Sequence, residues 1–123
     1  MVARIVFCED DPGIGKLVRV ALRPTGHEVH VAIDGEAGLA LIEDIRPDLV
    51  FTDVAMPRLD GLQLADAMKG RPHLAHIPVV LITASVQRAQ VEEGYRHGVT
   101  AHLAKPFSAQ DLVAMVSRML RAA

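Results

Sequence analysis

The sequence predicts an α/β protein in which a five-stranded parallel sheet is covered by helices on both faces. Five short apolar segments alternate along the chain with five segments whose apolar residues recur at helical spacing. Several of the apolar segments show no polar alternation, which is typical of strands that are buried on both faces. The alternation of strands and helices indicates a doubly wound sheet of (βα)5 type.

The size and composition of the chain fit a single domain spanning residues 1–123. Half of the residues are hydrophobic, but no apolar run approaches the ~20 residues that a membrane span needs. The formal net charge of -2 gives no general attraction to nucleic acid, and the N-terminus lacks a signal-peptide layout. The single cysteine, Cys8, fits a buried thiol in a reducing compartment. We therefore expect a soluble, cytoplasmic domain without a membrane segment.

The first half of the chain is expected to form three strands with two helices between them. The strands cover 5–8, 28–32 and 49–53. The first helix begins near Pro12, with Asp11 as its N-cap. The second helix covers 35–45, and its expected buried face consists of Ala37, Leu41 and Ile45.

The second half is expected to form three helices and two strands, the strands at 78–84 and 100–104. A helix after position 61 is marked by the apolar stripe Leu62, Leu64, Ala65 and Met68, and a polar, irregular connector covers 70–76. The next helix, 86–97, has only the thin stripe Val91, Gly94 and Tyr95, so it should be the least firmly packed. The last helix opens with a capping box between Ser108 and Asp111. Its expected packing residues are Leu112, Val116, Met119 and Leu120.

The segment 49–61 places a carboxylate where a buried strand reaches the surface. The apolar run of the third strand ends at Asp53, and Pro57 forbids helix immediately after it. Asp60 and Gly61 then offer the N-terminus of the next helix. Asp53 is therefore expected on a short loop at the C-terminal end of a central strand, the edge at which open α/β sheets bind ligands.

Polar residues lie at the same end of three of the other strands. Glu9, Asp10 and Asp11 end the first strand, and Thr83 and Lys105 end the fourth and fifth. Because parallel strands bring these ends to one edge, several carboxylates should face one pocket. Two such charges about 6 Å apart repel by roughly 2–3 kcal/mol at an effective dielectric constant near 20. Such a cluster must raise its pKa values or bind cations, and its hard oxygen ligands suit Mg²⁺ beside a phosphorylated group.

Five motifs together resemble the receiver domain of response regulators in two-component signalling, of which CheY is an example. They are Glu-Asp-Asp at 9–11, Asp53 with Met-Pro at 56–57, Asp-Gly at 60–61, Thr-Ala at 83–84 and Lys-Pro-Phe at 105–107. The resemblance covers the whole chain. It implies the flavodoxin-like strand order 2-1-3-4-5 and a switch that catalyses only its own phosphotransfer and slow dephosphorylation, not an enzyme.

The resemblance also implies a phosphoacceptor and a metal site. Asp53 would accept a phosphoryl group from a sensor histidine kinase or a histidine phosphotransfer protein. Asp10 would bind Mg²⁺ directly, and Glu9 would act mainly through water. Asp53 and the backbone carbonyl of Ala55 would complete the protein ligands.

Further residues would bind the phosphoryl group and transmit its presence. Thr83 and the amide of Ala84 would hold phosphoryl oxygens, and Lys105 would balance their charge. The bond between Lys105 and Pro106 would be cis. Thr83 and position 102 would form the switch, although position 102 is His102 here where the family usually carries Tyr or Phe. A downstream protein would then read the face formed by 86–97, 100–104 and the last helix, and a phosphorylation-dependent dimer is a further implication.

Other functional interpretations fit the sequence less well. A phosphate loop at 13–16 would need Gly at position 10 and Ser or Thr at position 17, which are Asp10 and Leu17 here. His73 and His76 lack the second pair that a zinc site requires. No helix-turn-helix is expected, so this chain alone should not bind DNA.

Three alternatives to a self-contained switch remain open. The first is a Mg²⁺-dependent aspartyl phosphohydrolase, which would carry a second Asp at position 55, where this chain has Ala55. The second is a receiver that is never phosphorylated, against which the complete set of Asp, Thr and Lys argues. The third is a receiver excised from a larger regulator.

Overall fold

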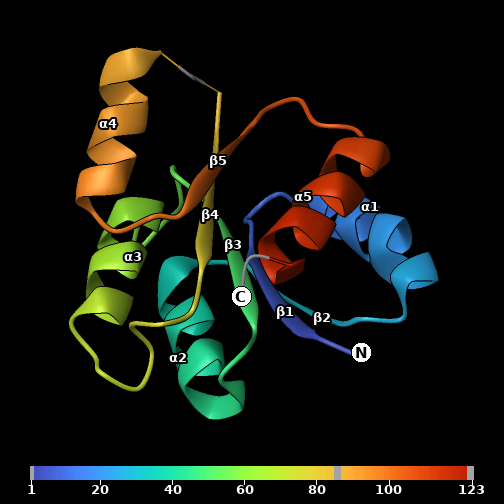
Figure 1. Cartoon of the computed structure of the whole chain (residues 1–123), viewed down its shortest axis with the longest axis horizontal. Coiled ribbons are helices and arrows are strands. Elements are labelled where there is room, and N and C mark those ends of the chain that lie inside the picture. The colour runs from blue at the N-terminus through green and yellow to red at the C-terminus, as the bar shows by residue number, and fades with distance from the viewer. Residues whose placement is uncertain (1, 85–86, 122–123) are drawn as a thin grey trace.

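A computed structural model of the protein describes residues 2–84 and 87–121. Over these residues, five strands alternate with five α-helices and one short 3₁₀ turn (Figure 1). The elements in chain order are β1 (Arg4–Cys8), α1 (Pro12–Leu22), η1 (Arg23–Thr25), β2 (Glu28–Ala32), α2 (Gly35–Ile45), β3 (Leu49–Asp53), α3 (Gly61–Lys69), β4 (Val79–Thr83), α4 (Arg88–Arg96), β5 (Ala101–Ala104) and α5 (Ala109–Arg121).

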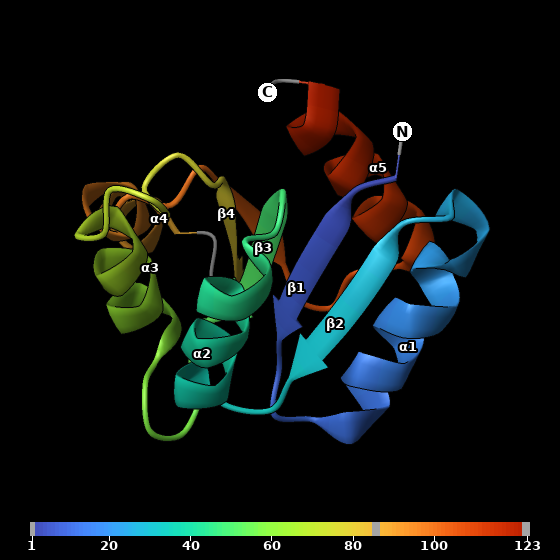
Figure 2. The same cartoon turned by 90° about the horizontal axis from the view of Figure 1, so that it is seen from below.

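The strands form one parallel sheet in the order β2-β1-β3-β4-β5, which confirms the predicted fold. In its register, Val6 of β1 lies beside His30 of β2 on one side and Val50 of β3 on the other. The carboxyl ends of all five strands therefore lie along one edge. Figure 2 shows the connections from β1 to α1 and from β2 to α2 leaving the sheet at this edge.

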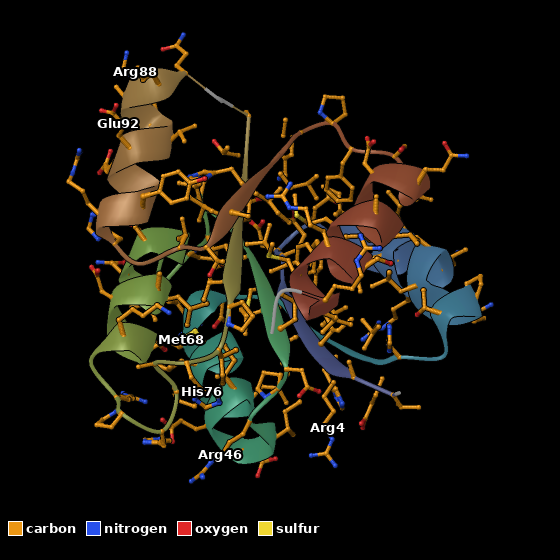
Figure 3. All side chains as sticks on the ribbon, viewed as in Figure 1. Arg4, Arg46, Met68, His76, Arg88 and Glu92 are labelled. Carbon is orange, nitrogen blue, oxygen red and sulfur yellow. The ribbon has the colours of Figure 1, made fainter. Side chains whose placement is uncertain are left out.

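Helices cover both faces of the sheet. Helices α1 and α5 pack on one face against Ile5, Phe7 and Phe51, and the rings of Phe7 and Phe51 stack with centroids 5.2 Å apart. Helices α2 and α3 cover the other face, where Figure 3 shows Met68 directed inward from α3. Because successive side chains of a strand point to opposite faces, the alternation of apolar residues supplies two separate cores.

The buried face of α2 differs from the sequence prediction. Ala37 is exposed and Leu41 and Ile45 are only half-buried, whereas Gly38 and Ile42 face the sheet. A Cβ at position 38 would lie 2.5 Å from Sγ of Cys8. The helix thus approaches the sheet through a residue without a side chain, and an apolar count does not register such a residue.

For the second half, one prediction is confirmed in part and another needs correction. The connector 70–76 is irregular as predicted, but it is not polar throughout, because Leu74 is fully buried in the core together with residues of α2 and α3. Tyr95, placed on the packed stripe of α4, is 52% exposed. Helix α4 buries only Gly94, and Arg88 and Glu92 project outward from it as an ion pair of 2.9 Å (Figure 3). The predicted start of this helix at Val86 lies outside the described residues.

The predicted helix starts that flank the site are confirmed. Asp11 accepts a hydrogen bond from the amide of Gly13 at 2.8 Å. Asp60 and Gln63 form a reciprocal capping box at the start of α3. Ser108 and Asp111 form another at the start of α5, with hydrogen bonds of 2.9 and 3.0 Å. Among the described residues, no helix is both long and apolar enough to cross a membrane.

Candidate functional site

Asp53 ends the central strand of the sheet and lies at its carboxyl edge. All five residues of β3 are buried, and Asp53 itself is 7% exposed. The amide of Ala55 donates a hydrogen bond to Oδ1 of Asp53 at 3.3 Å. A Cβ at Gly61 would clash with the carbonyl oxygen of Asp53, and the amide of Gly61 donates to the carbonyl of Val54. The loop after Asp53 is therefore held tightly against the end of β3.

The end of β1 brings two more carboxylates to Asp53. Carboxylate oxygens of Glu9, Asp10 and Asp53 lie within 4.8 Å of one another. Glu9 is 1% exposed, and its Oε2 accepts a hydrogen bond from the amide of Asp11 at 3.2 Å. Asp10 is exposed. The carboxylate of Asp11 caps α1 instead of joining the group, so the cluster contains three acidic residues.

Lys105 brings a positive charge to this cluster from the end of β5. Its Nζ donates a hydrogen bond to Oδ2 of Asp53 and lies 3.1 Å from Oε1 of Glu9. Burial alone would lower the pKa of Lys105, but the hydrogen bonds and charges of Asp53 and Glu9 outweigh burial and raise it. The peptide bond between Lys105 and Pro106 is cis, as the resemblance implied.

Glu9 has a strongly altered ionisation. The pKa of Glu9 is raised to about 7, mainly by burial and also by the negative charge of Asp53. The hydrogen bond from the Asp11 amide and the contact with Lys105 oppose this increase. One cation does not fully offset three acidic groups, so a second cation would stabilise the site. Carboxylate oxygens converging within this distance are the donor set that Mg²⁺ prefers.

Thr83 and His102 line the same cavity, which Val54, the residue after Asp53, also lines. Thr83 ends β4, the neighbour of β3, and Ala84 follows it in an exposed position. His102 lies in β5 on the face that α4 covers. Both residues line a cavity of about 70 Å³, together with Val54, Leu62, Leu81, Gln90 and Glu93. The structure thus brings the predicted switch residues to one place.

Gly94 has a structural role that the sequence pattern, in which it is only part of a packed stripe, does not indicate. A Cβ at this position would clash with Nε2 of His102 and lie 2.9 Å from its Cε1. The available signal was a glycine inside a helix, where its low propensity needs a reason. The sequence could not reveal that the reason is the ring of a residue on another strand.

Comparison with known families decides what this arrangement is. Residues 5–117 match the family model described as response regulator receiver domain. The chain belongs to the response regulator receiver domain family. Receiver domains act in two-component signalling as phosphorylation-controlled switches and are generally not classed as enzymes.

Individual relatives agree with this family assignment. The chain is 35% identical to the DNA-binding dual master transcriptional regulator RpaA of Synechocystis sp. over 118 residues, which are 96% of this chain and 49% of that protein. It is also 35% identical to the transcriptional regulatory protein RprY of Bacteroides fragilis, with the same coverage of both chains. This receiver domain therefore spans about half the length of these curated relatives.

Solved structures resemble the receiver domain over nearly its full length. The chemotaxis response regulator CheY4 of Vibrio cholerae superimposes with a TM-score of 0.93 at 28% identity. The match covers 98% of this chain and 100% of CheY4. The signal receiver domain of a histidine kinase from Syntrophus aciditrophicus gives 0.90 at 30% identity, covering 99% and 92% of the two chains.

Proposed function

We propose that this chain accepts a phosphoryl group on Asp53 from a histidine kinase or a histidine phosphotransfer protein, in the cytoplasm. The observation that carries the proposal is the position of Asp53. It is a buried carboxylate at the end of the central strand, it contacts Lys105, and two more carboxylates lie beside it. An oxygen of Asp53 attacks the phosphorus of a phosphohistidine, so that a P–O bond forms as the P–N bond breaks. The imidazole leaves with the electron pair of that bond and takes a proton from solvent.

The surrounding residues orient this nucleophile and neutralise charge. Lys105 contacts Oδ2 of Asp53, and the Ala55 amide contacts Oδ1, so the carboxylate has a fixed orientation. Asp10, Asp53 and the carbonyl of Ala55 would hold Mg²⁺, with Glu9 acting through water. The bound ion would supply positive charge next to the phosphoryl oxygens. Thr83 and the amide of Ala84 would bind the transferred group.

The signal would leave the site through the cavity that Thr83 shares with His102. In this proposal, movement of the Thr83 hydroxyl toward the phosphoryl group changes the position of the His102 ring. The face formed by α4, β5 and α5 then changes for a downstream protein or a second copy of the chain. The chain spans only about half the length of its curated relatives. What this face would regulate in a larger protein therefore belongs to the proposal as well.

The experiment is phosphorylation by acetyl phosphate in the presence of Mg²⁺, followed by intact-mass measurement. The wild-type protein should gain one phosphoryl group, and Asp53→Asn should gain none. Asp44→Asn, at an exposed position of α2, serves as the matched control and should be labelled like the wild type. Labelling of Asp53→Asn to the wild-type extent would show that the assignment is wrong.

The same preparation tests the rival phosphohydrolase. An aspartyl phosphohydrolase would release phosphate from a small phosphate ester over many turnovers. We expect no such turnover, because Ala55 offers no side-chain acid where those enzymes carry a second Asp. Sustained hydrolysis that depends on Asp53 would favour the rival.

A further inference from the structure

The ring of His102 packs directly against the backbone of α4. A Cβ at position 94 would clash with Nε2 of the ring and would also lie 3.1 Å from Cγ2 of Val99. Gly94 is the only buried residue of α4. Helix α4 therefore packs against the sheet largely through the contact between Gly94 and His102.

The ring lies in an environment that suits only its neutral form. Both ring nitrogens are inaccessible to solvent, and neither has a hydrogen-bond partner among the described residues. The ring of Tyr95 lies edge-on to it, with centroids 4.9 Å apart and an interplanar angle of 78°. A neutral imidazole carries one donor, whereas an imidazolium carries two donors and a charge. Burial accordingly lowers the pKa of His102.

Few charges face the ring from the elements packed around it. The β3–α3 segment contributes Val54 and Leu62 to the adjoining cavity, and β4 contributes Leu81 and Thr83, none of which ionises near neutral pH. Helix α4 contributes Gln90 and Glu93 to the cavity, and Tyr95 contacts the ring. Glu93 is half-exposed, and its Oε1 is 4.0 Å from Nε2 of His97, whose Nδ1 is 2.8 Å from Asp66 on α3. Glu93 is thus the one carboxylate among the described residues that line this cavity, and it lies beside a different histidine.

We propose that the contact between His102 and Gly94 is a proton-sensitive joint between β5 and α4, occupied by the neutral ring and vacated by the protonated ring. The ring would leave toward solvent, because an imidazolium needs water or a counter-charge that its inward position does not provide. The consequence for signalling rests on the proposed function, in which a partner reads the α4–β5–α5 face. The joint itself does not depend on phosphorylation.

The direction of the pH effect follows from the lowered pKa. Above the ordinary histidine value of about 6.5, the ring is neutral in both positions and pH has no effect. Below that value, each pH unit reduces the ratio of inward to outward ring by up to tenfold, until the inward ring also titrates. Acidic pH should therefore weaken the packing of α4 against β5, and neutral pH should preserve it.

Nuclear magnetic resonance of the unphosphorylated protein without Mg²⁺ tests the joint directly. The Cε1 proton of His102 gives the pKa of its ring. The chain has one Tyr and no Trp, so the tyrosine ring signals report on Tyr95 alone. We expect His102 to titrate below 6.5 and the Tyr95 signals to shift with the same midpoint. In Gly94→Ala, the added methyl should displace the ring, return its pKa toward 6.5 and remove the coupled shift.

Three further variants separate the joint from other groups. His102→Phe can fill the same space without titrating, so it should abolish the acid-induced shift of Tyr95 and keep the protein folded. His97→Gln should leave the shift in place, which excludes the neighbouring histidine as its source. Glu93→Gln should lower the pKa of His102 slightly at most, because Glu93 does not bond to the ring.

Two results would overturn the proposal. One is titration of His102 at its ordinary value with unmoved Tyr95 signals, and the other is an acid shift of Tyr95 that persists in His102→Phe. Failure of Asp53 to accept a phosphoryl group would refute the proposed function but would leave these titrations unchanged. The two proposals can therefore fail independently.

Discussion

Glu9 is the buried carboxylate that the metal-free site accommodates least well. It is 1% exposed, and its pKa is raised to about 7 mainly by burial and also by the charge of Asp53. In the unfolded chain its pKa would return to about 4.5. Between these two values the folded protein binds more protons than the unfolded chain, so this residue makes the protein less stable as pH rises. His102 acts in the opposite direction, because burial lowers its pKa.

Replacement of Glu9 by Gln should remove this pH dependence. Without Mg²⁺, the free energy of unfolding of the wild type relative to Glu9→Gln should fall by on the order of 1–3 kcal/mol between pH 5 and pH 8. Urea denaturation at several pH values measures this difference, and comparison with the variant cancels the contribution of His102. Glu36→Gln, at an exposed position of α2, is the control and should follow the wild type. Parallel profiles of wild type and Glu9→Gln would mean that Glu9 ionises normally.

Among the secondary-structure elements, the strands were easier to predict than the helix faces. The strands were predictable because their apolar runs are short, end in polar residues and alternate with helical patterns. The buried face of α2 was not predictable, because Gly38 lets this helix approach β1 closely at Cys8, and Cys8 belongs to another element. Leu74 was missed for a similar reason, since a single apolar residue in a connector gives no periodic signal. The contact between Gly94 and His102 likewise joins two elements and leaves no local pattern.

The close approach of α2 predicts that Gly38→Ala is destabilising although alanine favours helix by about 1 kcal/mol over glycine. The new methyl would lie 2.5 Å from the buried Sγ of Cys8, and overpacking of this kind costs about 1–3 kcal/mol. Cys8→Ala removes the obstructing sulfur. Gly38→Ala should therefore destabilise the Cys8→Ala protein much less than it destabilises the wild type. Thermal or urea denaturation of the four proteins measures the coupling. Additive effects of the two substitutions would show that α2 does not meet the sheet through this contact.

At the scale of the whole molecule, the parallel sheet is what assembles the site. Residues from the ends of β1, β3, β4 and β5 are far apart in sequence but meet at one edge because the strands run in the same direction. This part of the site was predictable from sequence, since each of these four strands ends in a polar residue or is followed by one. The separate roles of the acidic residues were not predictable from sequence, because only the fold shows that Asp11 caps a helix while Glu9 is buried. Three acidic groups around one lysine leave the metal-free fold with unfavourable repulsion.

That repulsion predicts how the whole domain responds to Mg²⁺. The ion should bind the folded site and not the unfolded chain, so at 100 times its dissociation constant it should add about 2.7 kcal/mol to the free energy of unfolding. Asp10→Asn should weaken this gain. The same variant should stabilise the metal-free protein by up to about 1 kcal/mol, because Asp10 is exposed and its repulsion is partly screened. Asp10 is the informative position, because Asp53 also contacts Lys105 and its replacement would remove an attraction as well as a repulsion.

Melting curves at constant ionic strength, with NaCl replacing MgCl₂ in the reference samples, measure both effects of Asp10→Asn. Asp44→Asn controls for the general loss of a surface carboxylate and should leave the response to Mg²⁺ unchanged. A wild-type melting temperature that millimolar Mg²⁺ does not move would argue against a metal site at this edge. A metal-free Asp10→Asn protein less stable than the wild type would show that the carboxylates at this edge are not in net repulsion.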